Sequence, residues 1–565
     1  MFKNEFKNSK LLNISFYACL LFVYGLKSAV AYTPPVGIPD PSWGSIHPID
    51  TVAPAQPAAW PSTEAPGYYY IDNTHGAATD SANPYGTPNR PRMTIPEITY
   101  SAGSYVEIHG GPYTGGGQLI LTANGTEANP VWIRGSSPAT KPTIRGETIL
   151  KGSYIFVENL YYDTDQKGIG LRVHSGSNLH HVVVRNVEMT GSGNAVGFNS
   201  AISITGSDSN RFHDIVIYNN HIHNLGDHTA AAAENDYHGV APSSNFDRVW
   251  ILDNHIHHMG GDSVQVGVAS IPDTARGSHV YIGNNEFHDD HENAVDIKEV
   301  NNVVVSSNLT YGYEGTGSSS GSIIVAHNNP DNIWIINNTV HSGWYGIVTT
   351  GSTNTWFIGN TVYNIHKDPA AGSWNPTSAY ATGSAIHFRG SSTGGAINNT
   401  IHNYDIGMQL LQGTASGYTI LNNILANRSE PSGLDINLVG TSLASNSTMD
   451  NNAFFNTDNG LRWGNSTTYT VEGTKLFANS CLSCIELSST PFKNASIFDF
   501  ELNSNSSAIN NGVDHSIYDT YFGLFGKRID KDLKGKTRVM GASIDIGSLE
   551  SGNSPAKIQT INFNN

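Results

Sequence analysis

The sequence predicts an all-β solenoid, a parallel β-helix, and two observations carry that prediction. The first is a recurring unit in which a Val- and Ile-rich strand ends in Asn and a short apolar element follows, as in VWILDNHIH and IWIINNTVH. The second is a set of strands after that corner, such as SVQVG and AVDIK, in which apolar and polar residues alternate. Alternation with period two in β-branched segments, punctuated by 58 Gly, argues against helices.

The corner asparagines give the size of the repeating unit. They recur 22 to 39 residues apart, which suits one coil of a solenoid. Asn tolerates left-handed backbone geometry and hydrogen-bonds locally, so we expect the stacked copies to form a ladder. The predicted corner positions are Asn159, Asn186, Asn220, Asn254, Asn285, Asn308, Asn338, Asn360, Asn399, Asn423 and Asn452.

The chain divides into four expected segments. Residues 1–31 read as a cleaved export signal, because a basic stretch and an apolar run precede the small residues of Ala29-Val30-Ala31. Residues 32–100, rich in Pro and aromatic residues, are expected to wrap and cap the N-terminal end. Residues 101–460 form the predicted β-helix, and residues 461–565 a C-terminal capping segment and tail. Covers are expected because an open solenoid end exposes unpaired strand edges.

Charge and cysteine content narrow the possible partners. The formal net charge of −17 becomes −20 once residues 1–31 are removed, which argues against a nucleic-acid partner. A polyanionic glycan is not excluded, because one local cleft can carry the opposite sign. No later run is apolar enough to span a bilayer, so a secreted or periplasmic monomer is expected. Cys481 and Cys484 are either one local disulfide or two free thiols.

The second strands of successive coils are expected to stack, so that their outward side chains form columns on one wall. Alignment by the inward apolar residues predicts a first column of Arg172, Ser203, Ala241, Gln265, Asp296, Ile324, Val348, His387 and Gln409. A second column, two residues further on, holds His174, Thr205, Gly267, Lys298, Ala326, Thr350 and Arg389.

Three consecutive coils concentrate groups capable of chemistry. The segments DYHGV, GGDSVQVG and HDDHENAVDIK supply them, whereas a single outward polar residue on a solenoid is by default a solvated surface group. Their clustering is therefore what indicates a site. The candidates are Asp236, His238, Asp262, Gln265, Asp289, Asp290, His291, Glu292, Asp296 and Lys298.

Over roughly residues 100–460 these repeats resemble the pectate-lyase-like superfamily, which implies a single-stranded right-handed parallel β-helix. AVDIK is similar to a strand of the chondroitinase B and alginate lyase group, which implies Asp296 as a metal ligand and Lys298 as the base. That group carries an Arg-His pair on the following coil, where this chain has Ala326-His327. GGDSVQVG resembles the Gly-Asp-Asp strand of polygalacturonase-type hydrolases, which implies Asp262 as a catalytic acid, although only one Asp is present.

The preferred function is a secreted polysaccharide lyase acting on a uronate-containing polymer such as alginate or pectin. β-Elimination needs a base for the C5 proton, a group that neutralises the carboxylate and a donor for the leaving oxygen. Lys298 is the expected base if its pKa is depressed, and His238 serves as base or acid. The expected substrate-binding residues are Gln265, His327, His387, Arg389 and Arg172. Ca²⁺ is expected among Asp289, Asp290, Glu292 and Asp296.

Two other functions remain open. A β-helix glycoside hydrolase would use Asp262 and Asp296, but their predicted separation of about 11 Å exceeds the 5–9.5 Å that paired glycosidase carboxyls need. A non-catalytic adhesin or glycan-binding solenoid would hold the polymer without cleaving it. Histidines after the Asn corners suggest metal binding or structural stacking, and their repetition favours stacking: His221, His223, His255, His257 and His258.

Overall fold

The computed structural model describes a single compact unit from Pro34 onward. The predicted export signal lies, except for its last residue, outside the described part of the chain. Described are residues 31–114, 118–163, 169–172, 179–191, 199–207, 209–229, 236–316, 319–370, 373–411, 417–538 and 543–552. No helix among these residues is long and apolar enough to cross a membrane.

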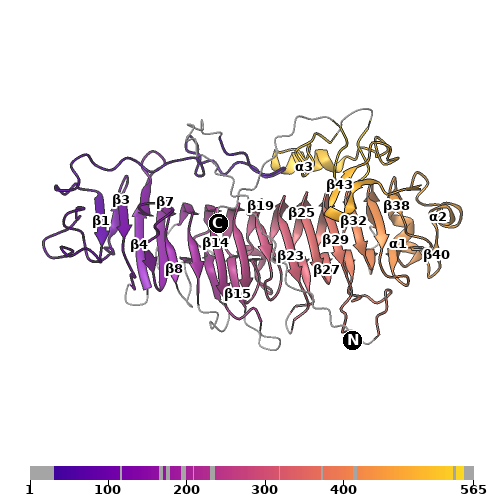
Figure 1. Ribbon diagram of the computed structural model, residues 1–565, viewed down its shortest axis with the longest axis horizontal. Helices are drawn as coiled ribbons and strands as arrows, with labels where there is room; N and C mark the ends of the chain where they lie inside the picture. Colours follow the sequence, from indigo (N-terminus) through magenta and orange to yellow (C-terminus); the bar gives the residue numbers. More distant parts are fainter. Residues whose placement is uncertain are drawn as a thin grey trace, which may run out of the picture. The chain divides into compact units, whose positions relative to one another are not determined.

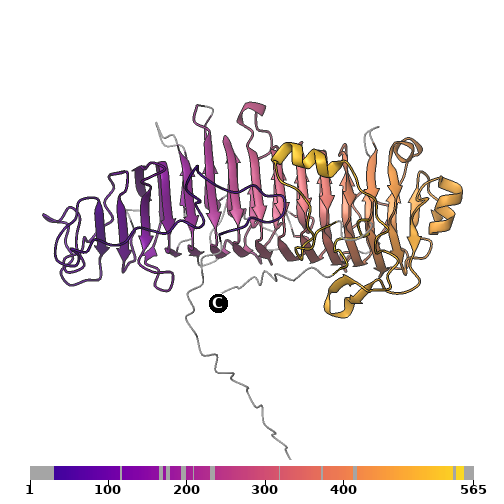
Figure 2. The same cartoon turned by 90° about the horizontal axis from the view of Figure 1, so that it is seen from above.

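The compact unit is a right-handed parallel β-helix, as predicted. From β5 onward the coils contribute strands to three parallel sheets, which we call sheets A, B and C, and the chain visits them in the order A, C, B (Figure 1). The first two coils, β1 with β2 and β3 with β4, have strands in sheets A and B alone. Successive strands of one sheet pair in parallel, for example Val280 of one coil opposite Val303 of the next. Seen from above, the strands stand side by side along the helix (Figure 2).

The strands have the following bounds. Sheet A contains β1 (Tyr68–Asp72), β3 (Tyr105–His109), β5 (Val131–Gly135), β7 (Glu147–Glu158), β10 (His180–Arg185), β13 (Phe212–Tyr218), β16 (Phe246–Leu252), β19 (Ser278–Gly283), β22 (Asn301–Ser306), β25 (Asp331–Ile336), β28 (Thr353–Ile358), β31 (Gly394–Ile397), β34 (Tyr418–Leu421) and β37 (Thr448–Asp450). The first half of β7 also pairs within sheet B.

Sheet B contains β2 (Thr99–Ser101), β4 (Gln118–Asn124), β9 (Ile169–Arg172), β12 (Asn199–Thr205), β15 (Tyr237–Ser244), β18 (Val264–Val266), β21 (Val295–Lys298), β24 (Ser322–His327), β27 (Tyr345–Thr350), β30 (Ser384–Arg389), β33 (Ile406–Leu410), β36 (Leu434–Leu438), β39 (Leu461–Trp463) and the antiparallel β40 (Thr468–Tyr469). Sheet C contains β6 (Thr143–Ile144), β8 (Tyr161–Asp163), β11 (Glu188–Thr190), β14 (His221–Leu225), β17 (His255–Met259), β20 (Glu286–His288), β23 (Leu309–Tyr313), β26 (Thr339–Gly343), β29 (Thr361–Ile365), β32 (Thr400–Tyr404), β35 (Ile424–Arg428), β38 (Ala453–Phe455) and β41 (Ile485–Glu486).

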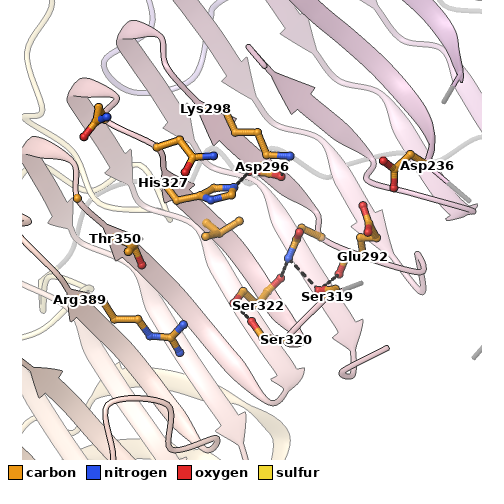
Figure 3. A pocket seen from close by; sticks show the side chains of 15 residues that line it. Asp236, Glu292, Asp296, Lys298, Ser319, Ser320, Ser322, His327, Thr350 and Arg389 are labelled. Atoms are coloured by element: carbon orange, nitrogen blue, oxygen red, sulfur yellow. Dashed lines mark hydrogen bonds and ion pairs between the residues drawn. The ribbon is translucent and has the colours of Figure 1, made fainter. Parts of the chain in front are cut away.

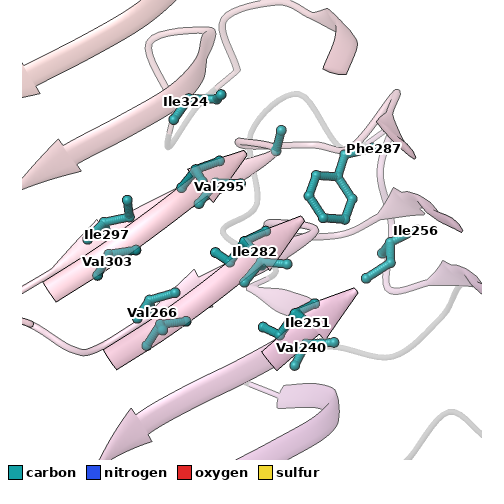
Figure 4. Packing of buried hydrophobic residues seen from close by; sticks show 14 of the residues in the cluster. Val240, Ile251, Ile256, Val266, Ile282, Phe287, Val295, Ile297, Val303 and Ile324 are labelled. Carbon is teal, nitrogen blue, oxygen red and sulfur yellow. The ribbon is translucent and has the colours of Figure 1, made fainter. Parts of the chain in front are cut away.

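The core is a continuous apolar stack inside the coils (Figure 4). Val264 and Val266 of β18 and Val295 and Ile297 of β21 are fully buried, in the alternation that the sequence predicts. Burying one such side chain contributes roughly 1.5–3 kcal/mol. Because the inward residues are buried on every coil, the residues between them are held on the outer face of the sheet.

The corner between sheets A and C uses two adjacent positions with different tasks. The first has positive φ, and Asn159 and Asn186 occupy it, with φ of 59° and 54°. The second is the buried ladder, which among the described residues begins at Asn220, whose side chain accepts from the backbone N–H of Val187 at 2.9 Å. The prediction that Asn159 and Asn186 belong to the ladder is therefore wrong by one residue, because Leu160 and Val187 stand at the ladder position.

Each ladder amide bonds both to its neighbour and to the backbone. Asn308 donates from Nδ2 to the carbonyl of Ile282 at 3.0 Å and to Oδ1 of Asn338 at 2.9 Å. Its own Oδ1 accepts from the backbone N–H of Asn285 at 2.9 Å. The same arrangement recurs along Asn220, Asn254, Asn285, Asn308, Asn338, Asn360, Asn399, Asn423 and Asn452.

Covering segments differ from the predicted boundaries. The first coil strand is β1, which pairs in parallel with β3, so the helix begins inside the segment predicted to wrap it. Preceding residues run along sheet A as an extended strap, residues 34–60 (Figure 2, indigo). At the other end lie α1 (Thr441–Asn446) and α2 (Val471–Ala478). The hairpin of β42 (Phe492–Asn494) and β43 (Asp499–Leu502) packs against sheet C, where Phe492 and Phe500 contact His402. Helix α3 (Ile517–Phe525) lies over sheet A in the middle of the β-helix, where Tyr521 contacts Trp334 (Figure 1). Cys481 and Cys484 form a disulfide, which settles the two readings left open above.

Replacing a ladder residue should destabilise the chain markedly. In Asn308→Ala, the buried N–H of Asn285 loses its acceptor and neighbouring amides lose their bridge, which should cost roughly 2–4 kcal/mol. The measurement is the urea midpoint and the thermal midpoint by circular dichroism. The control is Asn301→Ala, at a half-buried position outside the ladder, which should change either midpoint little. Equal loss in both variants would contradict the ladder's role.

Candidate functional site

The register of sheet B defines which outward residues stand side by side. Gln265 lies opposite Asp296, which lies opposite Val325, and the column continues through Val348, His387 and Gln409. The second column contains Lys298, His327, Thr350 and Arg389. The predicted columns are correct apart from β24 and Arg172.

The alignment of β24 was wrong by one residue. Ile324 and Ala326 are fully buried and point inward, so Val325 and His327 take the outward positions beside Asp296 and Lys298. At the N-terminal end, Arg172 lies opposite Thr205 rather than Ser203, and its side chain lies outside what the structure describes. His174 of the second predicted column also lies outside the described residues.

A cavity of about 490 Å³ opens on this wall (Figure 3). Asp296, Lys298 and His327 lie at one part of it, with Thr350 and Arg389 further along the same sheet. Its lining comprises Asp236, Glu292, Asn293, Asp296, Lys298, Ser319, Ser320, Ser322, Val325, His327, Asn328, Asn329, Thr350, Gly351 and Arg389. The lining is predominantly polar and contains both carboxylates and cationic groups, which suits a hydrated, charged ligand.

Asp296 holds the two other groups at the centre of the cavity. Its Oδ2 lies 2.7 Å from Lys298 Nζ, and its Oδ1 lies 2.8 Å from His327 Nε2. Burial raises the pKa of Asp296, but the His327 and Lys298 contacts outweigh it and leave the pKa lowered. Burial likewise lowers the pKa of Lys298, but the carboxylate of Asp296 reverses this and raises it. In the ligand-free site Lys298 is therefore a cation, which is the reverse of the condition for a lysine base.

A second polar layer lies against this centre without lining the cavity. Nδ1 of His238 accepts from the backbone N–H of Asp262 at 3.0 Å and lies 3.2 Å from Asp262 Oδ2. Nε2 of His238 contacts the Gln265 amide, whose Oε1 is 3.4 Å from Lys298 Nζ. The contacts thus run continuously across β15, β18, β21 and β24. Because Asp262 is fully buried, a sugar in the cavity has no direct access to its carboxyl group.

The His238 and Asp262 pair is held neutral. Burial, with a further contribution from Asp296, raises the pKa of Asp262 well above its usual range. Burial also lowers the pKa of His238. The lone pair of His238 Nδ1 is engaged by the backbone N–H of Asp262, and Asp262 Oδ2 is buried without a hydrogen-bond partner among the described residues. Both residues therefore position the Gln265 amide and, through it, Lys298.

Arg389 is the other cation of the cavity, and its partners are uncharged. Its Nε donates to His387 Nδ1 at 3.2 Å, and its guanidinium lies over the rings of Tyr345 and Tyr380, 4.5 and 5.3 Å from their centroids. No carboxylate of the described residues forms an ion pair with it. Nη2 of Arg389 is buried without a hydrogen-bond acceptor. His387 is fully buried behind it and does not line the cavity.

The four carboxylates predicted to bind Ca²⁺ are not gathered. Asp290 is buried and accepts from the backbone N–H of Met259 and the hydroxyl of Tyr313, and Asp289 pairs with its neighbour His288. Asp296 forms its contacts with Lys298 and His327. Glu292 lies near His238 and Asp262 and not near the other three carboxylates. This set does not fit a Ca²⁺ site, because its oxygens bond to separate partners in different directions.

The sequence patterns do not indicate the serines that line the cavity or Tyr380, which lies outside the cavity and contacts Arg389. Tyr380 comes from the loop between β29 and β30, and no periodicity marks it. The serines Ser319, Ser320 and Ser322 precede or begin β24, where the repeat pattern carries no signal. Their hydroxyls, together with Thr350, supply donors and acceptors for sugar hydroxyls.

Comparison with family models and with curated proteins finds no match. Among solved structures, a mannuronic-acid-specific polysaccharide family 6 lyase from human gut microbiota is 15% identical, covering 63% of this chain and 81% of that one, with a TM-score of 0.37. Pectate lyase Pel9A is 14% identical, covering 86% and 96%, with a TM-score of 0.36. The catalytic domain of a family 87 α-1,3-glucanase is 13% identical, covering 70% and 69%, with a TM-score of 0.35.

The fold of this chain is a right-handed parallel β-helix. The three parallel sheets of this chain establish it by their own strand pairing. At these identities and TM-scores the solved structures carry no argument about activity, so the function has to be argued from the cavity itself.

The neutral state of Asp262 can be tested through stability. Its folded-state pKa lies above the unfolded value of about 3.9, so between the two the native chain binds more protons, and stability falls as pH rises. The Asp262→Asn variant has no carboxyl group at this position, so it lacks this fall in stability with rising pH. Relative to the unmodified chain, the variant should therefore gain stability as the pH rises above about 4, as measured by urea midpoints. Asp273→Asn, at an exposed position, is the control. A difference that stays constant with pH would show that Asp262 is ionised in the native chain.

Proposed function

We propose that this chain is a polysaccharide lyase that cleaves a uronate-containing polymer by β-elimination. The observation that carries the proposal is the pairing, in one cavity, of a proton-transfer centre with a half-buried cation that lacks a carboxylate partner among the described residues. The centre is Asp296, Lys298 and His327, and the cation is Arg389.

Arg389 is the expected binding group for a substrate carboxylate. A guanidinium matches a carboxylate with two parallel hydrogen bonds, and Nη2 of Arg389, which is buried without an acceptor in the described part of the chain, is available as one of the donors. Lys298 and Arg389 stand in the same column three coils apart, which corresponds to roughly 14 Å along the helix. Two cationic points at that spacing suit a linear polyanion lying along sheet B.

His327 is the best-placed proton acceptor. Asp296 engages its Nε2 and orients the ring, which leaves Nδ1 to take the C5 proton while Lys298 neutralises the adjacent carboxylate. The C5–H electron pair forms the C4–C5 double bond, the C4–O bond breaks, and the leaving oxygen takes a proton from the imidazolium. This assignment replaces Lys298 as base, because Asp296 keeps its ammonium protonated.

The two assignments make different predictions for matched variants. With His327 as base, His327→Gln should lower kcat by about 10²–10⁴-fold. Lys298→Ala should lower activity severely with the fold intact, whereas Lys298→Arg keeps the positive charge and should retain measurable activity. The readout is ultraviolet absorbance of the unsaturated uronate over a panel that includes alginate and pectate. If Lys298→Arg were inactive and His327→Gln active, Lys298 would be the base and the assignment of His327 would be wrong.

Arg389 should act on binding more than on chemistry. Arg389→Gln removes a cation remote from the reacting bond, so KM should rise by about tenfold or more while kcat changes less. His402→Gln, on the unrelated sheet C, is the control and should leave both constants unchanged. A fall in kcat at constant KM would place Arg389 in the proton-transfer step instead.

The same panel separates the alternatives. New reducing ends without unsaturated product would indicate a hydrolase and would overturn the proposal, although buried Asp262 is poorly placed to contact a sugar. Binding of a glycan without either product would indicate an adhesin or a glycan-binding solenoid. Both outcomes leave the fold untouched.

A further inference from the structure

A block of histidines lies on the outer face of sheet C, away from the cavity on sheet B. His221 and His223 of β14 stand opposite His255 and His257 of β17, and His288 of β20 follows His257 on the next coil. All five are half-buried. No role in the proposed reaction uses them.

The block consists of two trios built in the same way. Each combines two histidines separated by one residue on one strand with a third on the next coil: His221, His223 and His257 in the first trio, and His255, His257 and His288 in the second. In each trio the diagonal pair brings two Nε2 atoms to 3.0 Å, between His221 and His257 and between His255 and His288. The three ligand nitrogens of each trio lie within 4.8 Å of one another.

Stacking alone does not require this convergence. The same column continues through Tyr311, His341 and Tyr363, whose rings stack at 5.0 and 4.6 Å between centroids. There His341 stacks between two tyrosines, with no second histidine Nε2 of the described residues beside its own, although its Nδ1 bonds its neighbour Ser342 as that of His257 bonds His258. Ring stacking therefore does not account for the paired Nε2 atoms of the two trios.

The nitrogen geometry suits a transition-metal ion. Zn–N bonds are about 2.0–2.1 Å, so two imidazoles on one ion hold their nitrogens about 3–3.5 Å apart. The diagonal pairs already have this spacing, and small side-chain rotations bring in the third nitrogen. Imidazole has an ordinary pKa of about 6.5, so at pH 7.5 most such rings offer a lone pair. Three nitrogen ligands and water complete a tetrahedral shell.

We propose that this face of sheet C binds one borderline divalent transition-metal ion of the Zn²⁺ class. His257 belongs to both trios, so the ion is held by His257 with either the His221 and His223 pair or the His255 and His288 pair. The site is independent of the proposed reaction. Bound metal would link neighbouring coils and raise the stability of the helix.

The test is isothermal titration calorimetry with ZnCl₂ on the full chain, purified without a polyhistidine tag. The unmodified chain should bind one Zn²⁺ and show a rise in thermal midpoint. His257→Gln removes both trios and should weaken Zn²⁺ binding by at least ~100-fold. His221→Gln and His288→Gln each leave one trio intact and should retain binding. His341→Gln, in the same column outside the trios, is the matched control.

Two results would overturn the site. One is an unmodified chain that binds no Zn²⁺ in the titration. The other is a His257→Gln variant that binds as tightly as the unmodified chain and His341→Gln. Circular dichroism of each variant shows whether the helix is folded, and His257→Asn provides a second removal of the shared ligand should His257→Gln fail to fold.

Discussion

The parallel register of sheet B is the constraint on which the candidate site depends. Backbone hydrogen bonds between coils set Gln265 against Asp296 and Lys298 against His327, although about thirty residues separate each pair in sequence. The inward valines and isoleucines leave no freedom to shift a strand, because a slip of one residue would turn its apolar side chains to water. The cavity therefore inherits its geometry from the core rather than from its own contacts.

Electrostatics within that geometry divides the polar residues into two layers. The outer layer is open to the cavity and consists of the ion pair between Asp296 and Lys298, with His327 beside it. The inner layer, Asp262 with His238, is buried and neutral, and it reaches Lys298 through Gln265. A buried carboxyl group kept neutral carries little cost of desolvation, whereas an ionised one would need a counter-charge. This division explains why groups close in the coil stack take different parts in the proposed chemistry.

The fold was predictable because its signal is repeated on every coil. The β18 and β21 strands show one apolar alternation each, and Val264, Gln265 and Val295 took the predicted sides. In β24 the run Ile323-Ile324-Val325 is apolar throughout, so periodicity does not reveal the outward residue, and His327 was placed one step from its position. The Ca²⁺ site predicted in the acidic turn before β21 does not fit the structure for a different reason. Alternation of apolar and polar residues gives no information about side-chain directions in a turn. The charge state of Lys298 required the distance to Asp296.

The extended strap along sheet A changes how the β-helix unfolds. Coils of a solenoid contact only their neighbours, so loss of structure can begin anywhere and spread. Here the carbonyl of Val36 accepts from Ser306, that of Pro39 from Trp250 and that of Pro48 from Arg185, in coils far apart along the axis. One extended segment is thus hydrogen-bonded to several distant coils. Local unfolding of one coil therefore also weakens the contacts of this segment with the others.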